Sequence, residues 1–388
     1  MSYERSPDVI SHPEADRMNT AGAEVFFLED RELPLVDLTL LVKCGRVDVP
    51  VEKTGLAEVF SGSLVQGGTR RLGPDLLAER LDDLAMDVSV SVREESTSVH
   101  ISVLKDHWEE GVALLGEILT SPAFESRVLD AVKKRAVTAL ARRGEDARAV
   151  AMREALIWHF KDHPYGRDPL LALETVPEIS DGDLRDFLST YFVPSNMVAS
   201  VAGDISTSEV ERSLKDLFSS LDGSPAPLRY VPEPGKSPPV LCFIDKPGQV
   251  QAQVVMMLPG VPRTHPDYWK LGLLVDLFGG RDSLLYTRLR EEMGLVYAAY
   301  AHQSYRWKAG MVVGYAGCRA DRTVEMLDET IRLMTGLHSD VPAGRLETKR
   351  LDLLNSFVFN VDSPRRLVTV YGRYYLRGEP LDLSLIHI

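Results

Sequence analysis

The segment VALLGEI (112–118) recurs in outline as VEMLDET (324–330), 212 positions later in the chain. Both segments place apolar residues three and four positions apart, which is the spacing of one helix face. The same offset places Gly166 on Gly378. A fixed offset that relates helices and loops alike indicates a duplicated structural unit.

The rest of the chain repeats strands and helices in the same order around these segments. In the first copy, apolar alternation predicts strands at 24–29, 35–43, 88–92, 99–103 and 197–202. Helical spacing predicts helices at 55–66, 74–84, 106–119, 125–143, 147–161, 180–191 and 206–221. In the second copy we expect strands at about 240–245, 250–258, 295–303 and 309–317 and helices at about 266–278, 283–293, 321–336 and 343–360. This order predicts an α+β fold of two homologous domains, each an antiparallel sheet covered by helices.

Composition sets the expected domain boundaries. Residues 222–239 contain six prolines and predict an extended linker between an N-terminal domain, 1–221, and a C-terminal domain, 240–382. We expect the second domain to be truncated, because a complete second copy would extend roughly 45 residues past residue 388. The final residues 383–388 (LSLIHI) resemble a sequencing-adapter artefact rather than native chain.

The charge balance excludes one large class of partner. Asp and Glu number 57 against 44 Lys and Arg, so the surface repels phosphate and a nucleic-acid binder is not expected. The three cysteines, Cys44, Cys242 and Cys318, form neither a zinc-type spacing nor a disulfide framework. Cys242 and Cys318 lie in apolar runs, and we expect both in the core.

No targeting or membrane signal is visible. No apolar run reaches the length that spans a bilayer, and the N-terminus lacks the pattern of a signal peptide. The expected location is therefore the cytoplasm as written, or the periplasm if the true N-terminus carries a signal peptide.

Several short motifs occur in a specific order. They are TGLAEVFSGSLVQGGT (54–69), HPYG (163–166), YFVPSN (191–196) and SLLYTRLREEMGLVYAAYA (283–301). In this order and at this spacing the chain resembles the insulinase/pitrilysin-type zinc metallopeptidases, especially bacterial two-domain subunits and mitochondrial processing peptidases. The resemblance implies the LuxS/processing-peptidase-like metallohydrolase fold in both domains.

The histidines and the glutamate of the family's inverted zinc motif, His-x-x-Glu-His, are replaced by other residues here. The resemblance places Glu58 and Gly62 at the two histidines, Ser61 at the catalytic glutamate and Ala139 at the distal ligand. Catalytic zinc needs three protein ligands and an open position. We therefore expect no metal or other cofactor in this chain, and zinc in a partner subunit. The apolar stripe Leu56, Val59, Phe60 and Leu64 still predicts a packed helix.

A second family feature is retained. Arg290 and Tyr297 have the spacing of the arginine and tyrosine that, by resemblance, reach the zinc site, hold the substrate carbonyl and stabilise the oxyanion. The residues alone also allow a simpler interpretation. In that interpretation Arg290 forms an ion pair with Glu291 or Glu292, and Tyr297 is a half-buried strand residue.

Histidines offer weaker candidates. His159 and His163 are four residues apart, which suits a metal, but Pro164 ends the helix and the HPYG turn is structural in the family. His100 lies on the polar face of a strand, which predicts a solvated side chain.

The function implied is that of a non-catalytic subunit of a heterodimeric zinc peptidase, inactive alone and acting on peptide substrates with a zinc-bearing homologous partner. The alternative is a scaffold or binding subunit of a larger complex with no peptidase role, similar to respiratory-complex core proteins that share the fold. A self-sufficient enzyme with a relocated site finds no support in the sequence.

Overall fold

The computed structural model describes residues 14–229, 231–235, 238–337, 341 and 343–381. Two compact units divide the chain. Unit 1 contains the described parts of 1–139, 171–230 and 358–384, and unit 2 contains those of 140–170 and 231–357. Neither unit is one continuous stretch of sequence. The candidate artefact at 383–388 lies outside the described residues.

Unit 1 is built on a six-stranded sheet in the order β1-β2-β6-β3-β5-β4. Its strands are β1 Asp16–Thr20, β2 Ala23–Glu29, β3 Leu35–Val42, β4 Asp87–Val92, β5 Thr97–Leu104 and β6 Met197–Gly203. Neighbouring strands are antiparallel except β2 and β6, which run parallel. All seven residues of β6 are buried, because the strand lies inside the sheet and the helix α13, Pro364–Arg377, packs on it.

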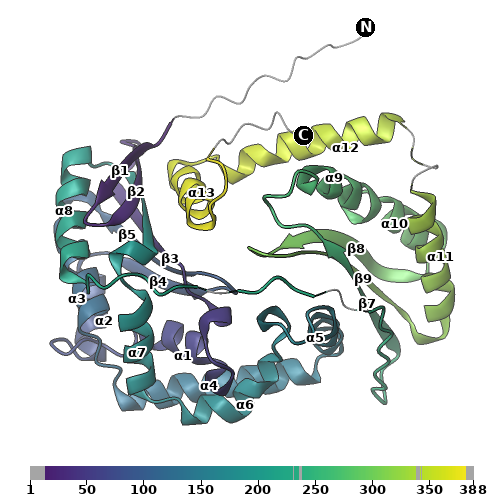
Figure 1. Cartoon of the computed structure of the whole chain (residues 1–388), viewed down its shortest axis with the longest axis horizontal. Helices are drawn as coiled ribbons and strands as arrows, with labels where there is room; N and C mark the ends of the chain where they lie inside the picture. Colours follow the sequence, from purple (N-terminus) through teal and green to yellow (C-terminus); the bar gives the residue numbers. More distant parts are fainter. Residues whose placement is uncertain (1–13, 230, 236–237, 338–340, 342, 382–388) are drawn as a thin grey trace, which may run out of the picture. The chain divides into compact units, whose positions relative to one another are not determined.

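Helices cover both faces of this sheet (Figure 1). They are α1 Leu56–Ser63, α2 Pro74–Asp83, α3 Trp108–Thr120, α6 Ala172–Thr175, α7 Asp181–Tyr191, α8 Thr207–Ser220, α13 Pro364–Arg377 and the part of α4 (Ser126–Glu145) up to residue 139. Helices α3 and α8 pack together, with the Trp108 indole donating to Ser213 Oγ at 3.0 Å. Helix α13 packs on β2, β3 and β6.

Unit 2 repeats the half of this sheet that contains β3, β5 and β4. Its sheet has the order β7-β9-β8, formed by β7 Gln251–Gly260, β8 Val296–Tyr305 and β9 Gly310–Arg319. Its helices are α5 Ala147–His159, α9 Tyr268–Gly279, α10 Leu284–Tyr286, α11 Thr323–Gly336 and α12 Ala343–Phe357. The predicted α+β class, with antiparallel sheets covered by helices, is confirmed.

Each unit includes one helix encoded in the other half of the sequence. Helix α5 belongs to unit 2 and packs on β7, whereas α13 belongs to unit 1 and packs on β6. Sequence analysis assigned no helix to 364–377, although its boundary signals are present. Ser363 caps the N-terminus, Pro364 occupies the first turn, and Gly378 ends the helix with a φ of 67°. The predicted boundaries 1–221 and 240–382 thus follow the repeat, while the compact units cut across it.

One predicted strand is wrong. Residues 240–245 form no strand, and Leu241 and Phe243 are 93% and 88% exposed. Strand β2, which precedes β3 as this segment precedes β7, lies between β1 and β6. Among the described residues of unit 2 no strand pairs with the free edge of β7. Without a ladder partner the segment has no backbone hydrogen bonds to hold it extended. Cys242 is exposed for this reason, contrary to expectation, whereas Cys318 is buried as expected.

Helices long and apolar enough to cross a bilayer are absent from the described part of the chain.

The close contact at Gly372 predicts a stability effect. A Cβ on Gly372 would lie 2.4 Å from Ser200 Oγ and 3.0 Å from Leu41 Cδ1. Gly372→Ala should therefore lower the free energy of unfolding by about 1–3 kcal/mol, although alanine is the better helix former. Gly182→Ala is the matched control, because Gly182 is an exposed glycine of α7 that meets only Ser180 Oγ at 3.5 Å. Urea denaturation should show a loss for the first variant and a gain of up to about 1 kcal/mol for the second; equal gains would contradict the packing of α13.

Candidate functional site

Helix α1 keeps the packing of the inverted-motif helix. Its start at Gly55 has a φ of 93°, and a Cβ there would lie 2.5 Å from Val176 Cγ2. Glycine can adopt this positive φ, and it has no Cβ to clash with Val176. Val59 and Phe60 are fully buried, as the stripe predicted, and the Phe60 ring lies 5.0 Å from that of Phe187. The helix is therefore a core element whether or not it carries chemistry.

Glu58 is engaged in an ion pair. Its carboxylate accepts from Arg46 Nε, and Arg46 Nη1 also donates to Glu94 at 3.1 Å. Although burial opposes the charge of Arg46, the two carboxylates raise its pKa above the ordinary value. The first zinc-motif position thus carries a carboxylate that a guanidinium already neutralises.

The other three motif positions provide no ligand set. Ser61 Oγ donates to the Val90 carbonyl at 2.9 Å. A Cβ on Gly62 would lie 2.9 Å from Val132 Cγ1 of α4, so a histidine does not fit there unless Val132 moves. Ala139 is exposed on α4 and carries no donor. The residues present do not fit zinc, and the described residues contain no group of three or more His, Cys, Asp or Glu arranged to hold a metal.

Arg290 lies on an irregular helix that is firmly anchored. After the Ser283 cap and α10, residues Thr287–Glu292 wind as a π-helix, with Leu289 fully buried. Gly294, with a φ of 60°, ends it, and Leu295 N donates to Leu289 O at 2.8 Å. Single π-turns are frequent at functional sites because they change where side chains point.

Two arginines on this helix have different surroundings. Arg288 pairs with Glu292 at 2.7 Å and with Glu329 at 2.5 Å, and Arg332 together with Arg288 lowers the pKa of Glu329 to about 2. Arg290 is exposed, and its guanidinium lies 5.7 Å from the Tyr286 ring centroid. The alternative ion pair of Arg290 with Glu291 or Glu292 is not present among the described residues.

Tyr297 lies on a β-bulge. Val296 pairs with Cys318 and Ala298 with Gly317, so Tyr297 has no partner on β9. Tyr297 is 54% exposed. Bulges redirect a side chain out of the ladder. Arg290 and Tyr297 thus lie on either side of the turn at Gly294 in unit 2, and the described residues show no hydrogen bond between them.

The histidine pair does not form a metal site. His163 is buried, its Nε2 lies 2.9 Å from the Pro232 carbonyl, and its Nδ1 accepts from Tyr165 N at 3.1 Å. Both ring nitrogens are therefore occupied, Nδ1 within the HPYG turn and Nε2 by the Pro232 carbonyl. Burial lowers the pKa of His159, which favours the neutral ring.

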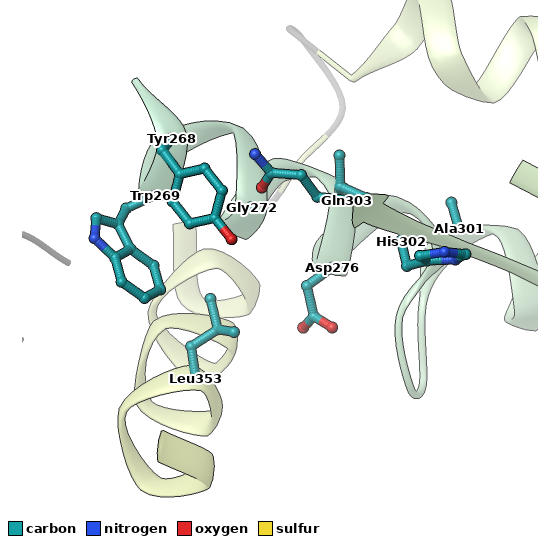
Figure 2. A pocket seen from close by; sticks show the side chains of 9 residues that line it. Tyr268, Trp269, Gly272, Asp276, Ala301, His302, Gln303 and Leu353 are labelled. Carbon is teal, nitrogen blue, oxygen red and sulfur yellow. The ribbon is translucent and has the colours of Figure 1, made fainter. Parts of the chain in front are cut away.

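A pocket of about 210 Å³ lies elsewhere in unit 2, between α9, β8 and α12 (Figure 2). Tyr268 and Trp269 form an aromatic wall, with Asp276 and Gln303 among the polar lining residues. Asp276 already lies 3.4 Å from Lys349 Nζ. None of the predicted site residues lines this pocket.

Sequence reasoning missed two groups of polar contacts. The Arg46 partner of Glu58 belongs to a short 3-10 turn, Arg46–Asp48, that has no periodic signal. His100, expected to be solvated, has a side chain only 17% exposed, because Arg365 of α13 lies against it. Both contacts join segments that are separated in sequence, so no local pattern predicts them.

Comparison with known families agrees with the motifs. Residues 25–164 match the model described as Insulinase (Peptidase family M16), and residues 178–352 match the Peptidase M16 inactive domain. The chain belongs to the M16 peptidase family. Within M16, it is an inactive-type member that lacks the zinc ligands at the inverted motif.

Some relatives in M16 are named as zinc proteases, and one is named as a non-peptidase homologue. The non-peptidase homologue YmxG of Helicobacter pylori is 24% identical over 390 residues, covering 97% of this chain and 86% of the relative. An uncharacterized zinc protease of Streptomyces coelicolor is 25% identical over 273 residues, covering 67% of this chain and 58% of the relative. A crystal structure of a peptidase M16 inactive domain from Pseudomonas fluorescens superposes with a TM-score of 0.88 at 22% identity, covering 95% of this chain and 89% of that one. The last similarity concerns the fold.

The geometry of α1 predicts the outcome of a zinc-binding assay. After incubation with excess zinc and desalting, the purified chain should retain far less than one zinc per molecule by elemental analysis, because Glu58 is paired and Gly62 and Ala139 offer no ligand. Glu58→Gln should leave this result unchanged. One tightly held zinc that Glu58→Gln removes would show that the helix still binds metal.

Proposed function

We propose that this chain is the non-catalytic subunit of a heterodimeric zinc peptidase. A zinc-bearing homologous subunit would supply the metal, the water nucleophile and the general base. This chain would supply Arg290 and Tyr297 to the substrate carbonyl. The substrates would be peptides or unfolded segments.

The observation that carries the proposal is the exposure of these two side chains without neutralising partners. Arg288 pairs with both Glu292 and Glu329, and the described residues show no ion pair between Arg290 and Glu291. The exposed Arg290 guanidinium lies near the Tyr286 ring, 5.7 Å from its centroid. A free guanidinium and a free phenol are the donor groups that suit a developing oxyanion.

The backbone around the pair supports a positioning role. Leu285 and Leu289 are fully buried and fix the helix in the core, which limits movement of Arg290. The bulge at Tyr297 directs the phenol away from the ladder. Preorganised donors stabilise a transition state without further rearrangement, so rigid placement suits this role.

The test uses the full-length chain mixed with its zinc-bearing homologue. Arg290→Ala or Tyr297→Phe should lower kcat of the mixture on the order of 10²–10³-fold, the usual loss for one oxyanion donor. Zinc content should stay unchanged, because neither residue ligates metal in this arrangement.

Arg322→Ala is the matched control. Arg322 is an arginine of the same unit whose ion pair with Glu325, at 2.5 Å, lies at the start of α11. Its loss should leave kcat unaltered while removing the same charge. Equal turnover of the wild-type, Arg290→Ala and Tyr297→Phe mixtures would remove the assigned role.

A second candidate is a scaffold or binding subunit without a peptidase role. The name of the Helicobacter pylori relative, a non-peptidase homologue, favours it. One measurement distinguishes the two functions. A scaffold would form a stoichiometric complex whose turnover, if any, does not respond to Arg290→Ala, whereas the peptidase subunit requires a response.

A further inference from the structure

The exchanged helices α5 and α13 begin in the same way. Asp146 caps α5 by accepting from Ala149 N at 2.7 Å, and Ser363 caps α13 by accepting from Arg366 N at 3.4 Å. In each helix the second residue is an arginine, Arg148 in α5 and Arg365 in α13. Each arginine contacts the sheet of the unit to which its helix belongs.

Arg148 meets aromatic groups. Its guanidinium carbon lies 4.4 Å from the Tyr315 ring centroid and 5.6 Å from that of Tyr300, and Nη2 donates to the Tyr300 hydroxyl. The Tyr315 hydroxyl in turn donates to Gln253 Oε1 at 2.5 Å. The Asp146 carboxylate also acts on Tyr315, and the His302 ring lies 6.0 Å from that of Tyr300.

Arg365 meets a titratable pair. Arg365 Nη1 lies 3.5 Å from Asp37 Oδ1 and 3.5 Å from His100 Nε2. His100 Nε2 is also 3.4 Å from Asp37 Oδ1, and His100 Nδ1 lies 3.1 Å from Thr39 Oγ1. The imidazole, the carboxylate and the guanidinium therefore contact one another as a triad.

The two contacts occupy equivalent places in the repeat. Asp37 pairs with Ser102 on β5, and Gln253 pairs with Gly317 on β9. His100 and Tyr315 each precede these partners by two residues, so they share a face with them. Equivalent positions on paired strands thus carry Asp37 and His100 in unit 1, and Gln253 and Tyr315 in unit 2.

We propose that Asp37, His100 and Arg365 form a pH-responsive clasp on the first turn of α13. With a neutral His100, Asp37 balances Arg365. Protonated His100 adds a second cation beside one carboxylate. In the neutral tautomer that directs Nε2–H toward Asp37, Nδ1 is an acceptor, so protonation makes Nδ1 a donor and the nearly buried Thr39 hydroxyl must then accept.

The electrostatic surroundings of His100 agree with a loss of stability on acidification. Burial and then Arg365 lower its pKa below the ordinary value, against the opposite effect of Asp37 on β3 and Asp87 on β4. A group whose pKa is lowered by folding stabilises the folded form while it is neutral, and this contribution is lost as pH falls. The loss begins near the ordinary histidine pKa of about 6.5 and continues down to the lowered value.

Loosening α13 would uncover an apolar face. Val368 of α13 packs on Phe26, Leu41, Val198 and Ala202, and the Phe26 ring stacks on Tyr371 with centroids 5.8 Å apart. Acidification would therefore expose a part of the sheet that is covered at neutral pH.

Hydrogen exchange measured by mass spectrometry tests the clasp on the full chain, after correction for the intrinsic pH dependence of exchange. Between pH 7.5 and 5.5 the protection of the first turns of α13 should fall several-fold, by at most tenfold per pH unit for one proton. Protection of α8, Thr207–Ser220, should stay constant and serves as the internal control, because this helix contains no histidine. Unchanged α13 protection, or an equal fall in α8, would overturn the proposal.

Two variants make the test specific. His100→Gln keeps a donor for Asp37 and removes the titration, so α13 protection should lose its pH dependence; a persisting dependence would contradict the role of His100. Arg365→Met should raise the pKa of His100 in an NMR titration, and Arg148→Met should leave it unchanged. A wild-type His100 that titrates at or above 6.5 would overturn the proposal even if both variants fail to fold.

Discussion

The structure depends on the packing of α5 and α13 on sheets that belong to the opposite half of the sequence. Helix α13 covers the face of β2, β3 and β6, with Val368 fully enclosed and Ser200 Oγ donating to its carbonyl at 3.0 Å. Burial of apolar area is the main favourable term in folding, so a sheet face without its helix would lose much of its stability. Neither half of the sequence can complete its own core.

In unit 1, helix α1 keeps its place in the core although it has lost the zinc ligands of the family. Phe60 and Val59 keep α1 in the core, and Gly62 permits its close approach to Val132 of α4. None of these roles requires a metal ligand, so the helix persists after the ligands are gone. Glu58, which could still bind a cation, is neutralised by Arg46.

In unit 2 the irregular backbone elements occur where exposed polar side chains are found. The π-turn carries Arg290, and the bulge in β8 carries Tyr297. Regular helix and strand geometry would place these residues in the register of their neighbours. The departures from regularity are held by buried residues such as Leu289, which anchors the backbone next to Arg290. The same repeated frame holds a titratable pair under α13 and a pair of tyrosines under α5, so duplication conserved the geometry while the side chains diverged.

Most helices and strands, the α+β class, the repeated order of elements and the loss of zinc ligands are predictable from sequence, because periodicity and residue identity are local properties. Arg290 and Tyr297 were located by motif, and their role stays a prediction. Three features become visible in the folded chain: 240–245 is not a strand, Cys242 is exposed and His100 lies beneath Arg365. Each of these outcomes depends on whether a distant segment pairs with or covers the residue. Strand pairing and burial are set by partners far away in the chain, and no local pattern encodes where those partners lie.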